Sequence, residues 1–97
     1  MTQSKPKKVI LENDPDFKLK KDLANRFNHL IGLKIVGVRY LTEEETEASG
    51  WYSSPIVIEL SDGSALIPQA DDEGNDGGAL WIANSKGKES LIPVIRV

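Results

Sequence analysis

The dipeptide Asp62-Gly63, which separates two apolar runs, is the feature that most constrains how this chain folds. Asp-Gly is typical of the tight two-residue turn that joins neighbouring antiparallel strands. With these residues as the loop, Ile58 pairs with Ile67, and apolar side chains meet on one face of the hairpin. Pro68 cannot donate a hydrogen bond to a neighbouring strand, so the second strand ends there or lies at a sheet edge.

Short apolar runs bounded by turn residues predict further strands. They lie at residues 33–41, 79–83 and 91–97, and a polar turn at residues 84–88 separates the last two. The last run contains Pro93, which again indicates an edge or a bulge. We also expect a short edge strand at residues 9–11.

One helix is predicted near the N-terminus. Asp14 can cap exposed amides, Pro15 suits a first turn and Asp16 favours the positive end of the helix dipole. Apolar residues then recur at helical spacing and form one stripe, Leu19, Leu23, Phe27 and Leu30. Gly32 supplies a left-handed terminus.

A second, short helix is predicted after Thr42. Thr42 and Glu45 have the spacing of a capping box, and the acidic run at residues 43–45 lies where the helix dipole favours negative charge. Further on, Trp51 and Tyr52 are adjacent, so in an extended segment one faces the core and the other faces solvent.

Together these elements predict an α+β fold that is mainly β. We expect the N-terminal helix to pack on a small curved antiparallel sheet of four to five strands. The short, proline-marked strands suit an SH3-like or Sm-like barrel, because closure removes exposed edges, and a flatter α+β sandwich is the alternative. Residues 1–8 are expected to form a flexible tail and residues 9–97 a single globular domain.

Composition narrows the functional classes. There is no cysteine, which excludes disulfides and thiolate chemistry, and the one histidine, His29, falls on the polar side of the helix. The basic half, residues 1–39, has a net charge of +5 and residues 40–97 have −8. A pI near 5.1 argues against a nucleic-acid partner, for which a pI above about 9 is typical. No apolar run approaches a membrane span or a signal peptide, so we expect a cytoplasmic protein without membrane contact.

The segment at residues 69–79 is acidic and rich in glycine, a composition that packing in a core does not require. Its candidate ligands for a calcium ion are Asp71, Asp72, Glu73 and Asp76. An EF-hand started at Asp71 fails, because its sixth position is Asp76 rather than glycine and its twelfth is Ile82 rather than glutamate. Phosphate binding is disfavoured because the carboxylates repel it. No nucleophile or nucleotide motif occurs, so we expect no catalytic residue and no cofactor.

One segment resembles a known group of proteins. The resemblance rests on Trp51-Tyr52, Pro55, Asp62-Gly63, Pro68 and the run at residues 71–80, about the middle third of the chain. This pattern resembles a family of small, uncharacterised bacterial proteins. The resemblance implies a bacterial, single-domain protein and carries no activity, ligand or site residue.

The sequence therefore predicts a binding or assembly module, whose partner is a basic or amphipathic protein or a second copy of the chain. The expected contact residues are aromatic and acidic: Trp51, Tyr52, Asp71, Asp72, Asp76 and Trp81. The alternative is a small domain that uses the loop carboxylates to bind calcium or another ligand, or for catalysis.

Overall fold

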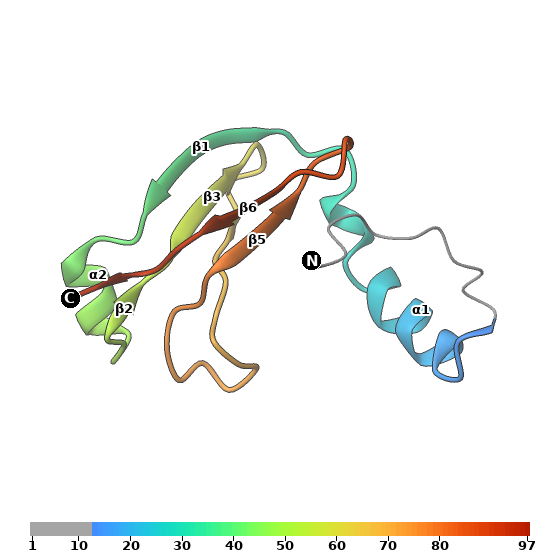
Figure 1. The fold of residues 1–97 in the computed structure, drawn as a ribbon, viewed down its shortest axis with the longest axis horizontal. Coiled ribbons are helices and arrows are strands. Elements are labelled where there is room, and N and C mark those ends of the chain that lie inside the picture. Colours follow the sequence, from blue (N-terminus) through green and yellow to red (C-terminus); the bar gives the residue numbers. More distant parts are fainter. Residues whose placement is uncertain (1–12) are drawn as a thin grey trace.

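A computed structural model describes residues 13–97 (Figure 1). The predicted tail at residues 1–8 and the predicted strand at residues 9–11 lie outside the described residues. The protein is α+β, and most of its regular structure is strands in small antiparallel sheets. Within residues 13–97, no helix is long and apolar enough to cross a membrane.

The largest sheet contains three strands in the order β1-β3-β4. Its strands are β1 (Ile35–Tyr40), β3 (Ile56–Leu60) and β4 (Ala65–Leu66). The pairing of β1 with β3 is antiparallel and shifts between Ile35 and Gly37, where one extra residue bulges. The strand predicted over residues 33–41 is confirmed.

The hairpin joining β3 to β4 was predicted in the wrong register. Ile58 pairs with Leu66 instead of Ile67, so the two strands are offset by one residue. The loop is longer than two residues, because the Leu60 amide donates to the Ser64 carbonyl at 2.8 Å and Gly63 has φ of 89°. A glycine in the left-handed region is typical of a three-residue loop, and a shift of one residue exchanges the faces of the second strand.

Four further strands form two separate pairs. They are β5 (Leu80–Ala83) with β6 (Glu89–Ile92), and β2 (Ser53–Ser54) with β7 (Ile95–Arg96). Pro93 divides the predicted last strand into β6 and β7, because it has no amide to donate. The expected single sheet of four to five strands is thus wrong. No closed barrel occurs among residues 13–97, and the SH3-like or Sm-like barrel stays a prediction.

The core is small and is centred on β3. Ile56, Val57 and Leu60 are its buried apolar side chains. Tyr40 pairs with Ile56 on the adjacent strand, and its hydroxyl donates to the Pro93 carbonyl at 2.8 Å. This bond ties the β1-β3-β4 sheet to the segment between β6 and β7.

Helix α1 (Phe17–Asn25) does not cover the sheet, contrary to the sequence-based expectation. None of its nine described residues is buried. In Figure 1 it stands beyond one end of the strands, and the apolar residues Leu19, Leu23 and Phe27 are 59%, 42% and 56% exposed. The spacing of the apolar residues predicted the stripe, but spacing does not show which surface packs against it.

The ends of this helical segment differ in detail from the prediction. The N-cap is Asp16 rather than Asp14, and Asp14 instead accepts the Asp16 amide at 2.8 Å and pairs with Lys20. The α-helix stops at Asn25, and a 3-10 turn, η2 (Asn28–Leu30), follows. Gly32, with φ of 88°, ends the segment as expected.

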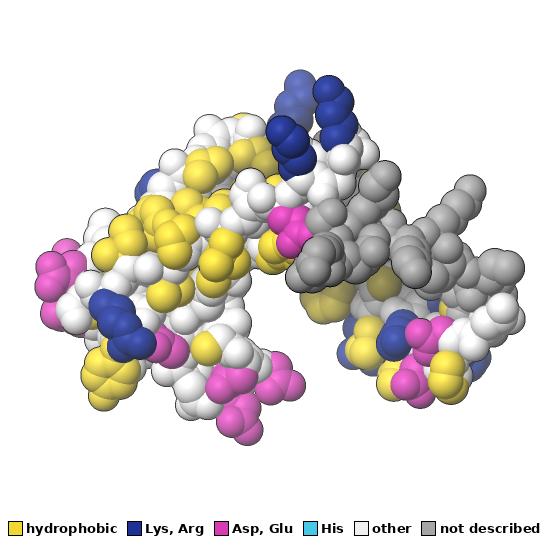
Figure 2. Space-filling model, viewed as in Figure 1, with side chains coloured by type: hydrophobic (Ala, Val, Ile, Leu, Met, Phe, Trp, Pro, Cys, Tyr) yellow, Lys and Arg dark blue, Asp and Glu magenta, His cyan; other side chains and the backbone are white. Residues whose placement is uncertain are grey.

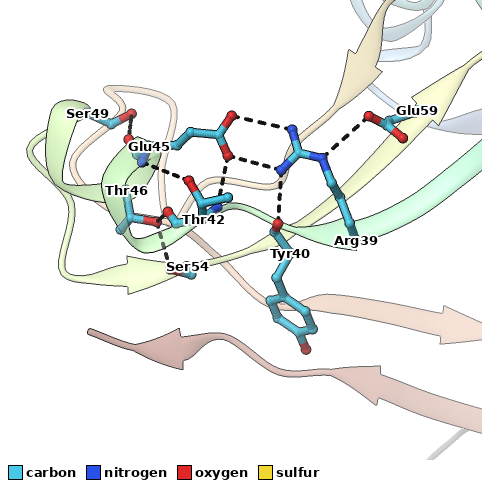
Figure 3. Close-up of polar contacts among 8 residues, drawn as sticks. All are labelled: Arg39, Tyr40, Thr42, Glu45, Thr46, Ser49, Ser54 and Glu59. Atoms are coloured by element: carbon cyan, nitrogen blue, oxygen red, sulfur yellow. Dashed lines mark hydrogen bonds and ion pairs between the residues drawn. The ribbon is translucent and has the colours of Figure 1, made fainter.

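Helix α2 (Glu43–Ala48) has the predicted capping box. Thr42 accepts the Glu45 amide at 3.0 Å, and the Glu45 carboxylate accepts the Thr42 amide at 2.8 Å. Figure 3 shows Arg39 between Glu45 and Glu59, on the side of β1 opposite the Tyr40 ring. The hydrogen bond from Arg39, followed by the amide of Thr42, lowers the pKa of Glu45 to about 2. The acidic run is therefore used locally, as predicted.

Candidate functional site

The two adjacent aromatics take the opposite environments that the sequence predicts. Trp51 is half-buried, and its indole Nε1 donates to the Gly74 carbonyl at 2.7 Å. Tyr52 is 72% exposed. Trp51 therefore holds the acidic loop against the body of the protein, and Tyr52 is the aromatic that a partner can reach.

Helix α2 and strand β2 position Trp51 and Tyr52 between them. The Trp51 amide donates to the Thr46 carbonyl at 3.0 Å, just after α2 ends. The hydroxyls of Thr46 and Ser54, both buried, lie 2.7 Å apart and join α2 to β2 (Figure 3). A satisfied pair of buried hydroxyls fixes one local arrangement, since separating them would leave buried polar groups unpaired.

Asp76 anchors the other end of the loop. Its Oδ1 accepts the amides of Tyr52, Ser53 and Gly77 at 3.1, 2.9 and 2.8 Å. Partial burial opposes the charged form, but the amides of Gly77, Ser53 and Tyr52 outweigh it and hold the pKa of Asp76 below its ordinary value of 3.8. Asp76 is a predicted contact and metal residue, and in the structure its carboxylate binds amides of the protein itself.

Replacement of Asp76 with asparagine is therefore expected to lower the urea midpoint of unfolding at about pH 7. Because the folded-state pKa lies below 3.8, the charge stabilises the fold above that pH and this contribution is lost as the pH falls through the lowered pKa. The difference between the wild type and Asp76→Asn should shrink at about pH 2.5. Urea titrations at both pH values measure this difference, and Asp72→Asn is the control. A difference between Asp76→Asn and the wild type that does not depend on pH would contradict this role of the Asp76 charge.

The acidic loop is ordered by its own side chains. Asp71 Oδ1 accepts the Glu73 amide at 2.9 Å, and the Asn75 amide group donates to Asp71 Oδ2 at 2.8 Å. The Asn75 hydrogen bond is the main cause of the lowered pKa of Asp71. Gln69 pairs with Gly77 at the base of the loop. The loop is thus a closed unit rather than a loose connection.

The four calcium-ligand candidates do not converge in the structure. Within residues 13–97, no group of three or more histidine, aspartate or glutamate side chains is arranged to hold a metal ion. Asp71 and Asp76 turn oxygens toward amides of the chain, as described above. Asp72 and Glu73 are exposed at the loop. Figure 2 shows acidic side chains gathered at the tip of this loop.

A shallow depression lies beside Tyr52. Its volume is about 350 Å³, and it is lined by Glu47, Gly50, Trp51, Tyr52 and Val97. We call it the Tyr52 depression. The Val97 amide donates to the Tyr52 carbonyl at 3.0 Å, which continues the pairing of β2 with β7. The depression therefore combines aromatic and aliphatic surface with one carboxylate.

Three residues that line this depression were not among the predicted site residues: Glu47, Gly50 and Val97. Glu47 was assigned to the helix, and Val97 was read only as part of a strand. Val97 approaches Tyr52 through the pairing of β2 with β7, which joins segments about 40 residues apart and leaves no local signal. Glu47 and Gly50 lie within five residues of Tyr52, where the chain leaves α2. Trp81, a predicted contact residue, lies elsewhere: it is on β5, is 53% exposed and donates to Glu89 at 3.0 Å.

Comparisons with known proteins add no relative: the sequence matches no family model, and neither a curated protein nor a solved structure is significantly similar to it.

Proposed function

We propose that this protein is a binding module that takes a basic, amphipathic protein segment at the Tyr52 depression. The observation that carries the proposal is the exposure of Tyr52 at the rim of a depression that also contains Val97 and Glu47. Tyrosine supplies a large contact area with few rotatable bonds and is enriched among the residues that dominate binding energy.

Electrostatics supports a basic partner. Glu47 lines the depression, and Asp72 and Glu73 are exposed in the loop that Trp51 holds beside it through Gly74. Complementary charge speeds association and selects partners more than it adds affinity. A segment with apolar residues on one side and lysine or arginine at its borders matches this surface.

Replacement of Tyr52 tests binding more directly than replacement of Trp51. Removal of the Trp51 indole would release the Gly74 carbonyl and the loop, so loss of binding in that variant would have a structural cause. Tyr52 is the better choice, because its ring is exposed and its backbone makes the hydrogen bonds.

Binding is tested with two designed helical peptides, one of leucine and lysine and one of leucine and glutamate in the same pattern. Calorimetry should detect binding of the basic peptide only. Tyr52→Ala should weaken it by tenfold or more, since truncation of a central aromatic costs about 2 kcal/mol or more. Val36→Ala, a change at an exposed position of β1, is the matched control. Equal binding of both peptides, or unchanged binding by Tyr52→Ala, would remove the proposal.

A further inference from the structure

Helix α1 has nine residues and none of them is buried, so its apolar side is uncovered. Isolated helices shorter than about 12–15 residues are marginal in water, and most helical stability in proteins comes from packing of an apolar face. The stripe of Leu19, Leu23 and Phe27 is exposed, and Ile31 just beyond it is 78% exposed. The helix therefore needs a surface to cover this stripe.

The charges on α1 indicate what that surface carries. Lys18, Lys20 and Lys21 outnumber Asp22 within the helix, and Arg26 forms its C-cap. By helical spacing, Lys20 and Arg26 lie on either side of the apolar stripe. The helix is thus a basic, amphipathic segment, the class of ligand proposed above for the Tyr52 depression.

Besides the Tyr52 depression, the described residues expose apolar side chains on β1 and on the β5–β6 pair, where Trp81 lies opposite Leu91. The turn between β5 and β6 carries Lys86 and Lys88, and the one carboxylate of the pair, Glu89, accepts the Trp81 indole. Charge therefore favours the depression over both. The exposed side chains of β1, Val36 and Val38, follow directly after Lys34, which repels a basic helix. The Tyr52 depression contains Glu47 instead. Further acidic residues precede Tyr52 in α2 and follow it in the acidic loop.

The helix does not reach this depression in its own chain. Figure 1 places α1 at one end of the molecule, and α2, β2 and the C-terminus, which line or border the depression, at the other. Only residues 31–34 connect η2 to β1. A second copy can satisfy both surfaces at once when the two chains lie side by side in opposite directions, related by a two-fold axis.

We infer that the partner of the Tyr52 depression is helix α1 of a second copy, in a two-fold pair in which each chain receives the other's helix. This inference rests on the proposed function and names its ligand. Reciprocal exchange uses two helices and two depressions, which doubles the buried area of a single contact. That matters because specific interfaces bury roughly 1,200 Å² or more in total.

Mixing of two variants tests the exchange. The helix variant carries Leu19→Gln and Phe27→Gln, both at exposed positions, and the depression variant carries Tyr52→Ala. Light scattering should find the wild type dimeric and each variant alone at least tenfold weaker in dimerisation, since neither retains an intact contact. The mixture keeps one intact contact, so native mass spectrometry should find heterodimers of intermediate stability.

Controls separate the failure of this inference from failure of the proposed function. Asn25→Gln lies across the helix from the stripe and should dimerise as the wild type does, and added salt should weaken the wild-type pair. A monomeric wild type, or a mixture no more associated than its components, overturns the exchange. Binding of the leucine-lysine peptide at Tyr52 would still stand in that case, whereas failure of that peptide alone would overturn the proposed function.

Discussion

Replacement of Ile56 with alanine is expected to lower the free energy of unfolding by about 2–5 kcal/mol, the usual range for an isoleucine truncated in a core. Ile56 is 5% exposed and, with Val57 and Leu60, is one of three buried aliphatic side chains that pack beside Pro55 among the described residues. A core this small has few neighbours that can move in to fill the space. Against a total stability of roughly 5–15 kcal/mol, the loss would leave a substantial unfolded fraction at growth temperature.

Urea denaturation followed by tryptophan fluorescence measures this loss. Ile35→Ala is the matched control, because it makes the same chemical change at a side chain that is 62% exposed. Surface substitutions of this kind usually change stability by less than about 0.5 kcal/mol. Similar losses for the two variants would show that the stability of the fold does not centre on β3.

Replacement of Gly77 with alanine is expected to detach the acidic loop. A Cβ at Gly77 would lie 2.5 Å from the Ser53 carbonyl oxygen and 2.6 Å from Pro55 Cδ, and both residues are buried. These atoms belong to the chain's most enclosed segment, so they cannot move aside without disturbing β2. Overpacking of this kind costs about 1–3 kcal/mol. Because Asp76 precedes Gly77, its hydrogen bonds to Tyr52 and Ser53 should also be lost.

The effect of Gly77→Ala is read in two measurements. The urea midpoint should fall, and Trp51 emission should shift toward that of an exposed indole, because its hydrogen-bond partner Gly74 belongs to the same loop. Asp72→Ala, an exposed change in the loop, should alter neither. An unchanged midpoint with unchanged emission would mean that the loop can adjust without leaving the surface.

Local sequence patterns predicted the features that depend on neighbouring residues. Spacing within a few residues sets the capping box of Thr42 and Glu45 and the opposite environments of Trp51 and Tyr52. It also predicted the left-handed conformation of Gly32. The same holds for the strand over β1, whereas the single strand predicted over residues 91–97 is divided at Pro93.

Features that depend on distant pairing were predicted poorly. The register of the β3–β4 hairpin differs by one residue because Asp-Gly fits both a two-residue and a three-residue loop. The apolar stripe of α1 was assigned to the sheet of the same chain, since periodicity identifies an apolar face and not its partner. The acidic loop was treated as a set of ligands, although Asp71 and Asp76 bind amides of the protein itself.

The base of the acidic loop is closed by backbone hydrogen bonds, so the tip of the loop can vary in sequence independently of the base. Gln69 pairs with Gly77, the Gly78 amide donates to the Pro68 carbonyl at 2.9 Å, and the Ala70 amide donates to the Asp76 carbonyl at 2.9 Å. The tip, residues 71–75, is therefore closed off by its own stem, and it contacts the body of the protein through the hydrogen bond from Trp51 to Gly74. A change in the charge of Asp72 or Glu73 would alter the recognition proposed above, and the hydrophobic core need not change with it.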